Sequence, residues 1–385
     1  MKKWNIAICC VLCCILSLIS CFDMGQVSAE GEDLQIDAKS SLLMDFDSGT
    51  ILYEDNADEK VPVASIVKLM TVLITMEEIE AGNLSLDEKL TTTENASGMG
   101  GSQVFIDPYV EYTVDEMLKS VIVASANDAS VALAEKIAGT EQTFVSRMNK
   151  RAQELGLKDT IYVNASGLPE PNQYSTARDV AKLFREVIKH KLYFEYSTIW
   201  MDNLTHPSGR KTEVVNTNKL IRYFKGCDAG KTGSTDEAGY CLVATAEKGN
   251  MRLISVVLGA TTSTARFNES SKLLNYGFSN FENKQIIDVC ESVGEIKLLK
   301  SKTESVKAYA SDNYYVITRK GEHSSYEISL EMIDKLKAPV HKGDKVGEIK
   351  IIKDGAVVDA LDVVILEDIE TIRYSDSLKE IISRW

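Results

Sequence analysis

The clearest pattern in the sequence is a nearly continuous apolar segment from Ser65 to about Ala81. A helix over this segment would carry apolar side chains on almost every face, and a helix of this kind is buried inside a globular core. Gly82 and Asn83 favour its end. The apolar positions are Ile66, Val67, Leu69, Met70, Val72, Leu73, Ile74, Met76 and Ile79.

Helical spacing of apolar residues also predicts five further helices. They cover residues 114–124, 128–137, 141–155, 176–189 and 267–278. Strands are indicated by short apolar runs on either side of turn residues, at 41–46 and 50–53 and in a hairpin of 240–246 with 252–259. Strands therefore flank a helical middle, and this order predicts an α+β domain with helices packed on an antiparallel sheet.

After about residue 284 the pattern consists of short strands only, which predicts a separate small all-β domain. The strands are expected at 306–310, 314–318, 326–328, 348–352 and 357–361. We place the α+β domain at 33–283, the β domain at 290–373 and a short amphipathic tail at 374–385. In a helical tail Leu378, Ile381, Ile382 and Trp385 would share one face, so we expect at most peripheral membrane contact.

The N-terminus has the features of an export signal. Lys2 and Lys3 precede an apolar run at 6–19, and Val27-Ser28-Ala29 supplies small residues for cleavage after residue 29. Two other fates remain open: lipidation at Cys21, which follows Leu18-Ile19-Ser20, and retention as an uncleaved anchor. We therefore expect an exported protein in the cell wall or at the outer face of the cytoplasmic membrane.

Charge and composition exclude several classes of protein. The net charge of −14 argues against binding to nucleic acid. The four histidines have no metal-ligand spacing, so we expect no metal and no cofactor. Only three cysteines follow the predicted signal, too few for a disulfide framework.

Candidate chemistry begins with Ser65-Ile66-Val67-Lys68, a Ser-x-x-Lys element at the start of the buried helix. This spacing places both side chains on one helical face, and a lysine with a pKa lowered by burial can act as a base toward a serine. A lysine inside a buried apolar helix is also unusual, which indicates a functional role for Lys68. A second match, Ser208 to Lys211, lies in a polar stretch that we interpret as an exposed loop.

Two further elements follow in order. Ser125-Ala126-Asn127 lies between two predicted helices, 60 residues after Ser65. Lys231-Thr232-Gly233 occurs once and opens a predicted strand, in which Gly233 would let a ligand backbone approach closely. A literal Ser311-Asp312-Asn313 falls in the β domain, where we expect a turn.

Together these elements resemble the low-molecular-mass penicillin-binding proteins, the D-alanyl-D-alanine carboxypeptidases. The resemblance extends from about Ser40 through the β domain. It includes Asn164-Ala165-Ser166-Gly167-Leu168, Tyr174 to Asp179, Asp236 to Tyr240, Ala338-Pro339-Val340 and Lys342 to Gly347. It implies a penicillin-binding-type (β-lactamase-like) catalytic domain of helices and antiparallel sheet, followed by a small all-β domain.

The resemblance also implies roles for individual residues. Ser65 would attack the peptide bond between the terminal D-alanines of a peptidoglycan stem peptide, with Lys68 as base and Ser125 as proton relay. Asn127 would orient Lys68 and the substrate amide. Lys231, with Thr232 and Gly233 beside it, would hold the substrate carboxylate, and the N–H groups of Ser65 and Ser234 would form the oxyanion hole. β-Lactam antibiotics would acylate Ser65. Arg178 and Asp179 are expected to form a structural pair.

Three other functions use the same scaffold. A β-lactamase would need a carboxylate to deacylate the penicilloyl ester; Glu170 and Asn172 are the nearest candidates but do not have the required spacing. A DD-endopeptidase that cleaves cross-links remains open as a close relative. A non-catalytic wall-binding module is disfavoured because all three motifs are intact.

Overall fold

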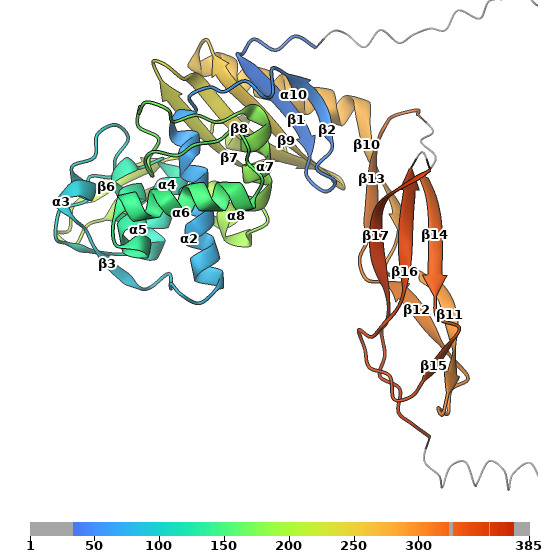
Figure 1. The fold of residues 1–385 in the computed structure, drawn as a ribbon. Coiled ribbons are helices and arrows are strands. Elements are labelled where there is room, and N and C mark those ends of the chain that lie inside the picture. Colours follow the sequence, from blue (N-terminus) through green and yellow to red (C-terminus); the bar gives the residue numbers. More distant parts are fainter. Residues whose placement is uncertain (1–33, 323–325, 354, 373–385) are drawn as a thin grey trace, which may run out of the picture. The chain divides into compact units, whose positions relative to one another are not determined.

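The structure is a computed structural model that describes residues 34–322, 326–353 and 355–372. The predicted export signal and the predicted amphipathic tail lie outside these residues. Up to residue 280 the described chain forms helices and an antiparallel sheet, and after it the chain forms strands (Figure 1). This order confirms the predicted fold class.

A five-stranded antiparallel sheet forms the framework of the first part, in the order β2-β1-β9-β8-β7. The first and last of these strands along the chain, β1 and β9, pair with each other in the middle of the sheet. Strand β7 lies at an edge and pairs with β8 only. The strands are β1 (Ser40–Asp45), β2 (Ile51–Asp55), β7 (Cys227–Thr235), β8 (Gly239–Lys248) and β9 (Met251–Ala260).

Helices cover the two faces of this sheet, because alternate side chains of a strand point to opposite faces. Leu42 and Met44 of β1 belong to the large core formed with the helical part. Leu43 points the other way, toward α10 (Ser263–Asn280). At the contact, Gly277 lets α10 lie close to the sheet: a Cβ there would come within 2.8 Å of the Leu43 side chain.

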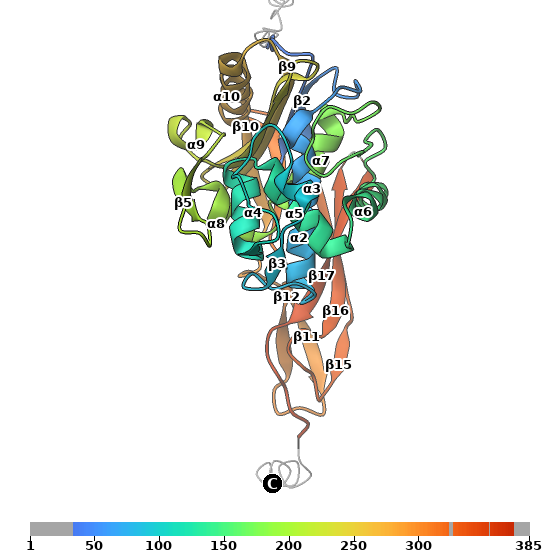
Figure 2. The same ribbon diagram turned by 90° about the vertical axis from the view of Figure 1, so that its left-hand side faces the viewer.

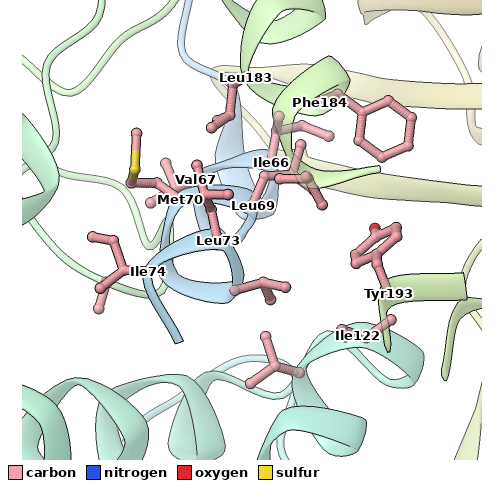
Figure 3. Packing of buried hydrophobic residues seen from close by; sticks show 14 of the residues in the cluster. Ile66, Val67, Leu69, Met70, Leu73, Ile74, Ile122, Leu183, Phe184 and Tyr193 are labelled. Atoms are coloured by element: carbon pink, nitrogen blue, oxygen red, sulfur yellow. The ribbon is translucent and has the colours of Figure 1, made fainter. Parts of the chain in front are cut away.

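The helical part is arranged around α2, which α4, α5, α6 and α7 contact (Figure 2). All apolar residues from Ile66 to Met76 are buried, as the pattern predicted, and Figure 3 shows Leu69, Leu73 and Phe184 in this core. The elements are η1 (Ala64–Val67), α2 (Lys68–Glu80), α3 (Glu94–Ser97), α4 (Val114–Val123), α5 (Asn127–Ala138), α6 (Glu141–Glu154), α7 (Ala177–Val187), α8 (Lys191–Ser197) and α9 (Leu220–Tyr223), with the short strands β3 (Lys89–Thr91), β4 (Glu111–Thr113), β5 (Met201–Thr205) and β6 (Lys211–Val215).

Threonine side chains cap the starts of α3, α4, α6, α7 and α10. Thr113 and Glu116 form a reciprocal capping box at α4. Thr176 caps α7 by accepting a hydrogen bond from the Asp179 N–H. Such caps satisfy N–H groups that have no partner within the helix.

The second part has a six-stranded sheet in the order β14-β16-β17-β12-β11-β15 and a β10–β13 pair. Its core includes Ile296, Ile351 and Val363. The strands are β10 (Phe281–Ile287), β11 (Ser292–Leu299), β12 (Ser305–Ala310), β13 (Tyr314–Arg319), β14 (Tyr326–Met332), β15 (Lys335–Lys337), β16 (Lys345–Lys353) and β17 (Ala356–Ile365). Ser311-Asp312-Asn313 lies in the turn between β12 and β13, as expected.

The structure differs from the sequence-based expectation at two places near the motifs. The turn that contains Ser65 is a 3₁₀ turn rather than the first turn of an α-helix. The strand that was expected to begin at Lys231 begins at Cys227 instead, so Lys231 lies in the middle of the nine-residue β7. Among the described residues, no helix is long and apolar enough to cross a membrane.

Candidate active site

Ser65 and Lys68 are brought together by the 3₁₀ turn before α2. Side chains three residues apart eclipse one another in a 3₁₀ turn, and Lys68 Nζ lies 2.9 Å from Ser65 Oγ. The turn begins at Ala64, a non-glycine residue with φ of +50°. Such strain persists where surrounding contacts impose it: no room exists for a Cβ at Gly167 or Gly233, which pack against the backbone of Ala64 and Val63.

Lys68 is fully buried and has three oxygen neighbours. Besides Ser65 Oγ, it donates to Asn127 Oδ1 at 2.6 Å and to the Ser166 carbonyl oxygen. Burial lowers the pKa of Lys68 well below its usual value; the positive charge of Lys231 lowers it further, and Asp128 opposes both. The two partners other than Ser65 can only accept hydrogen bonds. A neutral amine satisfies both with its two N–H groups and directs its lone pair at the Ser65 hydroxyl.

Ser125 lies in the short connection between α4 and α5 with a φ of +61°. Its Oγ accepts a hydrogen bond of 2.7 Å from Lys231 Nζ, across the site. Lys231 is also buried and donates to the Thr232 carbonyl oxygen at 2.9 Å. Burial, together with the charge of Arg266, lowers the pKa of Lys231 to about 7. The site therefore contains two lysines whose pKa values are far below that of a lysine in water.

Asn127 is the first residue of α5 and uses both ends of its side-chain amide. Its Oδ1 accepts from Lys68, and its Nδ2 donates to the Gly100 carbonyl oxygen at 2.6 Å. Its backbone N–H donates to the Ser102 carbonyl oxygen at 2.7 Å. The amide is thus held by two different segments of the chain.

Strand β7 forms one wall of the site at the edge of the sheet. A Cβ on Gly233 would lie 2.6 Å from the Val63 carbonyl oxygen and 3.1 Å from the Ser65 nitrogen. Gly233 is therefore required for β7 to approach the turn that carries Ser65, and Ser234 follows it, exposed. The Thr232 hydroxyl donates to Thr217 Oγ1 at 2.8 Å.

The structure thus brings Ser65, Lys68 and Asn127 into direct contact, and Ser125 into contact with Lys231, with Gly233 against the turn of Ser65. Sequence reasoning gave no role to three contributors: the Ser166 carbonyl, the Thr217 hydroxyl and Arg266, which donates to the Gly233 carbonyl oxygen at 3.2 Å. A buried lysine needs hydrogen-bond acceptors, so the sequence indicated that Lys68 has further partners. It did not indicate which residues they are.

The other candidates lie outside this network. Arg178 and Asp179 do not pair with each other as expected. Arg178 bonds Asp58 and Glu54, and Asp179 accepts from Thr160 and from the Asp159 N–H, because adjacent positions on α7 point in different directions. Glu170 and Asn172 are exposed, and Ser208 lies in the turn between β5 and β6.

Comparisons with known proteins match two family models to this chain. The family model for D-alanyl-D-alanine carboxypeptidase matches residues 26–262, and that for the C-terminal domain of penicillin-binding protein 5 matches residues 281–371. D-alanyl-D-alanine carboxypeptidase DacF of Bacillus subtilis is 39% identical over 354 residues, which cover 92% of this chain and 91% of the relative.

Solved structures show the same similarity. Penicillin-binding protein 5 of Haemophilus influenzae is 34% identical with a TM-score of 0.70, covering 87% of this chain and 98% of that one. Penicillin-binding protein D2 of Listeria monocytogenes, solved in an ampicillin-bound form, is 34% identical with a TM-score of 0.57, covering 64% of this chain and 99% of that one. The chain belongs to the D-alanyl-D-alanine carboxypeptidase family.

Proposed function

We propose that this protein is a serine-type D-Ala-D-Ala carboxypeptidase that removes the terminal D-alanine from peptidoglycan stem pentapeptides through an acyl-enzyme on Ser65. The observation that carries the proposal is the buried Lys68 amine, 2.9 Å from Ser65 Oγ, whose other two neighbours are oxygens that can only accept. Membership of the family supports the choice of substrate.

Acylation begins when Ser65 Oγ attacks the carbonyl carbon between the two D-alanines and its proton passes to Lys68. The N–H groups of Ser65 and Ser234 stabilise the oxyanion that forms. As the C–N bond breaks, Ser125 passes a proton to the amine of the leaving D-alanine. Water then attacks the ester, which releases the shortened peptide and returns the proton to Ser65.

The wall formed by β7 recognises the end of the substrate. Protonated Lys231 and the Thr232 hydroxyl bind the terminal carboxylate, and Asn127 binds the amide of the peptide. Lys231 contacts Ser125 Oγ at 2.7 Å, so recognition of the carboxylate and protonation of the leaving amine involve adjacent groups.

A β-lactamase is the less favoured function for this site. Such an enzyme needs a carboxylate that activates water against the penicilloyl ester. The described contacts of Ser65 and Lys68 are with hydroxyl, amide and carbonyl oxygens, and Glu170 is exposed.

The N-terminal sequence supports export, and we propose that the enzyme acts in the cell wall or at the outer face of the cytoplasmic membrane. Lys2, Lys3 and the apolar run after them have the pattern of a signal peptide. The tail at 374–385 would add weak peripheral contact with the membrane.

Replacement of the nucleophile should abolish the chemistry. We expect Ser65→Ala to lose both D-alanine release and covalent labelling by a fluorescent penicillin, because the site has no second nucleophile in contact with Lys68. The matched control is Ser208→Ala, which alters the exposed Ser-x-x-Lys element and should label normally. Labelling of Ser65→Ala at the normal rate would refute the assignment.

Replacement of the base should prevent acylation without unfolding the protein. Lys68→Arg keeps a cation, but arginine does not lose its proton at working pH, so acylation should fall by about 10²–10⁴-fold, the usual contribution of a general base. Stopped-flow labelling with penicillin measures this rate, and Lys211→Arg is the control. A normal acylation rate in Lys68→Arg would show that another group takes the proton.

The two lysines should give a bell-shaped pH profile for kcat/KM. Lys68 works when neutral, so activity is lost as the pH falls through its lowered pKa. Lys231 binds the carboxylate when protonated, so activity is lost as the pH rises through its pKa of about 7 in the free enzyme. Lys231→Arg should move this alkaline limb upward, since arginine keeps its charge. An unchanged alkaline limb in this variant would assign that limb to another group.

Penicillin and peptide should differ in turnover. Cleavage of the peptide frees D-alanine and opens a path for water, whereas the opened β-lactam stays attached to Ser65 and blocks that path. With excess benzylpenicillin we expect about one equivalent to be consumed promptly and slow loss afterward, because no carboxylate among the described residues contacts Ser65 or Lys68. Rapid repeated hydrolysis of penicillin without D-alanine release would favour the lactamase instead.

A further inference from the structure

Asp128 is a fully buried carboxylate next to Asn127, and no step of the mechanism uses it. Its two oxygens accept three backbone N–H groups: Val104 at 3.1 Å, Ile106 at 3.2 Å and Ala129 at 2.9 Å. Two of these donors belong to segment 100–106, which is neither helix nor strand. Charge-assisted hydrogen bonds to a carboxylate are stronger than neutral ones. Asp128 therefore anchors a segment that has no hydrogen-bond ladder of its own.

The anchored segment in turn determines which way the Asn127 amide faces. The carbonyl oxygens of Gly100 and Ser102 accept from Asn127 Nδ2 and from its backbone N–H, at 2.6 and 2.7 Å. A carbonyl oxygen accepts only, so the NH₂ end must face Gly100, and Oδ1 must face Lys68. The segment passes so close that a Cβ on Gly101, where φ is +77°, would lie 2.8 Å from Asn127 Nδ2.

We propose that Asp128 is a positioning residue for acylation: its buried carboxylate holds segment 100–106 in place, and this segment orients the Asn127 amide that in turn holds the Lys68 amine against Ser65. The inference rests on the proposed role of Lys68 as the base. Asp128 acts through Asn127 and touches neither the nucleophile nor the substrate.

The charge of Asp128 has a second effect, on the pKa of Lys68, that a purely structural role would not produce. The charged groups that act on Lys68 are Lys231 of β7, which lowers its pKa, and Asp128 of α5, which raises it. Asp128 also acts to raise the pKa of His206, but burial and the charge of Arg210 outweigh it and keep that pKa below its usual value. Removal of the Asp128 charge should therefore lower the pKa of Lys68 and move the acid limb of acylation to lower pH.

The test compares Asp128→Asn with two other variants by the rate of penicillin acylation as a function of pH. In Asp128→Asn an NH₂ group would face a backbone N–H, so the segment loosens. We expect the plateau rate to fall by about 10–100-fold, the range that a misplacement of up to 1 Å produces, and the acid limb to move to lower pH. Glu135→Gln is the matched control, because Glu135 lies on the same helix but bonds Thr93 and Asn95 instead.

Gly101→Ala disturbs the Asn127 amide through segment 100–106 and leaves the charge of Asp128 in place. We expect a slower plateau rate with the acid limb where the wild type has it. If Asp128→Asn does not fold, this variant decides, and a normal rate in Gly101→Ala would overturn the proposal.

Two results with folded Asp128→Asn would also overturn it: acylation within about twofold of the wild type, or a slower rate with an unmoved acid limb and a lower melting temperature, which indicates structural support only. Failure of the wild type to be labelled at Ser65 would instead contradict the proposed function.

Discussion

The arrangement depends on the burial of one amine. Removing a lysine side chain from water disfavours its charged form, and the helical core that surrounds Lys68 consists largely of apolar residues. An amine in that position needs two acceptors and a donor. The protein supplies the acceptors from two distant segments, at Asn127 and Ser166, and the donor from Ser65 in the turn just before Lys68. The core helix therefore shapes the candidate site as well as stabilising the fold, because the same apolar packing that holds the fold together lowers the pKa of Lys68.

Two glycines allow the segments around the Lys68 amine to pack closely. Gly167 and Gly233 have no room for a Cβ and lie against the carbonyl oxygens of Ala64 and Val63. Because they press on the turn from two sides, Ala64 adopts a positive φ that its side chain disfavours. The strained turn presents Ser65 to the edge strand, and the strain is compensated by the packing of α2 and the sheet around it.

Much of this fold could be predicted from local patterns, and the exceptions have a common cause. The core helix, the β8–β9 hairpin and the three motifs could be predicted because each depends on the spacing of apolar residues, or on residue types, within a short stretch of sequence. Strand β7 was expected to begin at Lys231 but begins at Cys227. Its first residues lack alternating large apolar side chains, and their conformation comes from pairing with β8. Ser166, Gly100 and Ser102 contribute through their backbone carbonyl groups. Every residue has such a group, so no feature of the sequence could identify these three.

The contacts of the site also connect residues that are far apart along the chain. Lys68 meets Asn127 across 59 residues and Ser166 across 98, and Lys231 meets Ser125 across 106. Closing loops of this length costs chain entropy before the contacts repay it. No isolated segment can therefore assemble a neutral lysine beside a serine, and a partly folded chain carries an ordinary, unreactive hydroxyl. Under the proposed mechanism, the capacity to form an acyl bond appears only when the helical part and the edge strand have both docked, so covalent labelling of Ser65 would report the completion of folding.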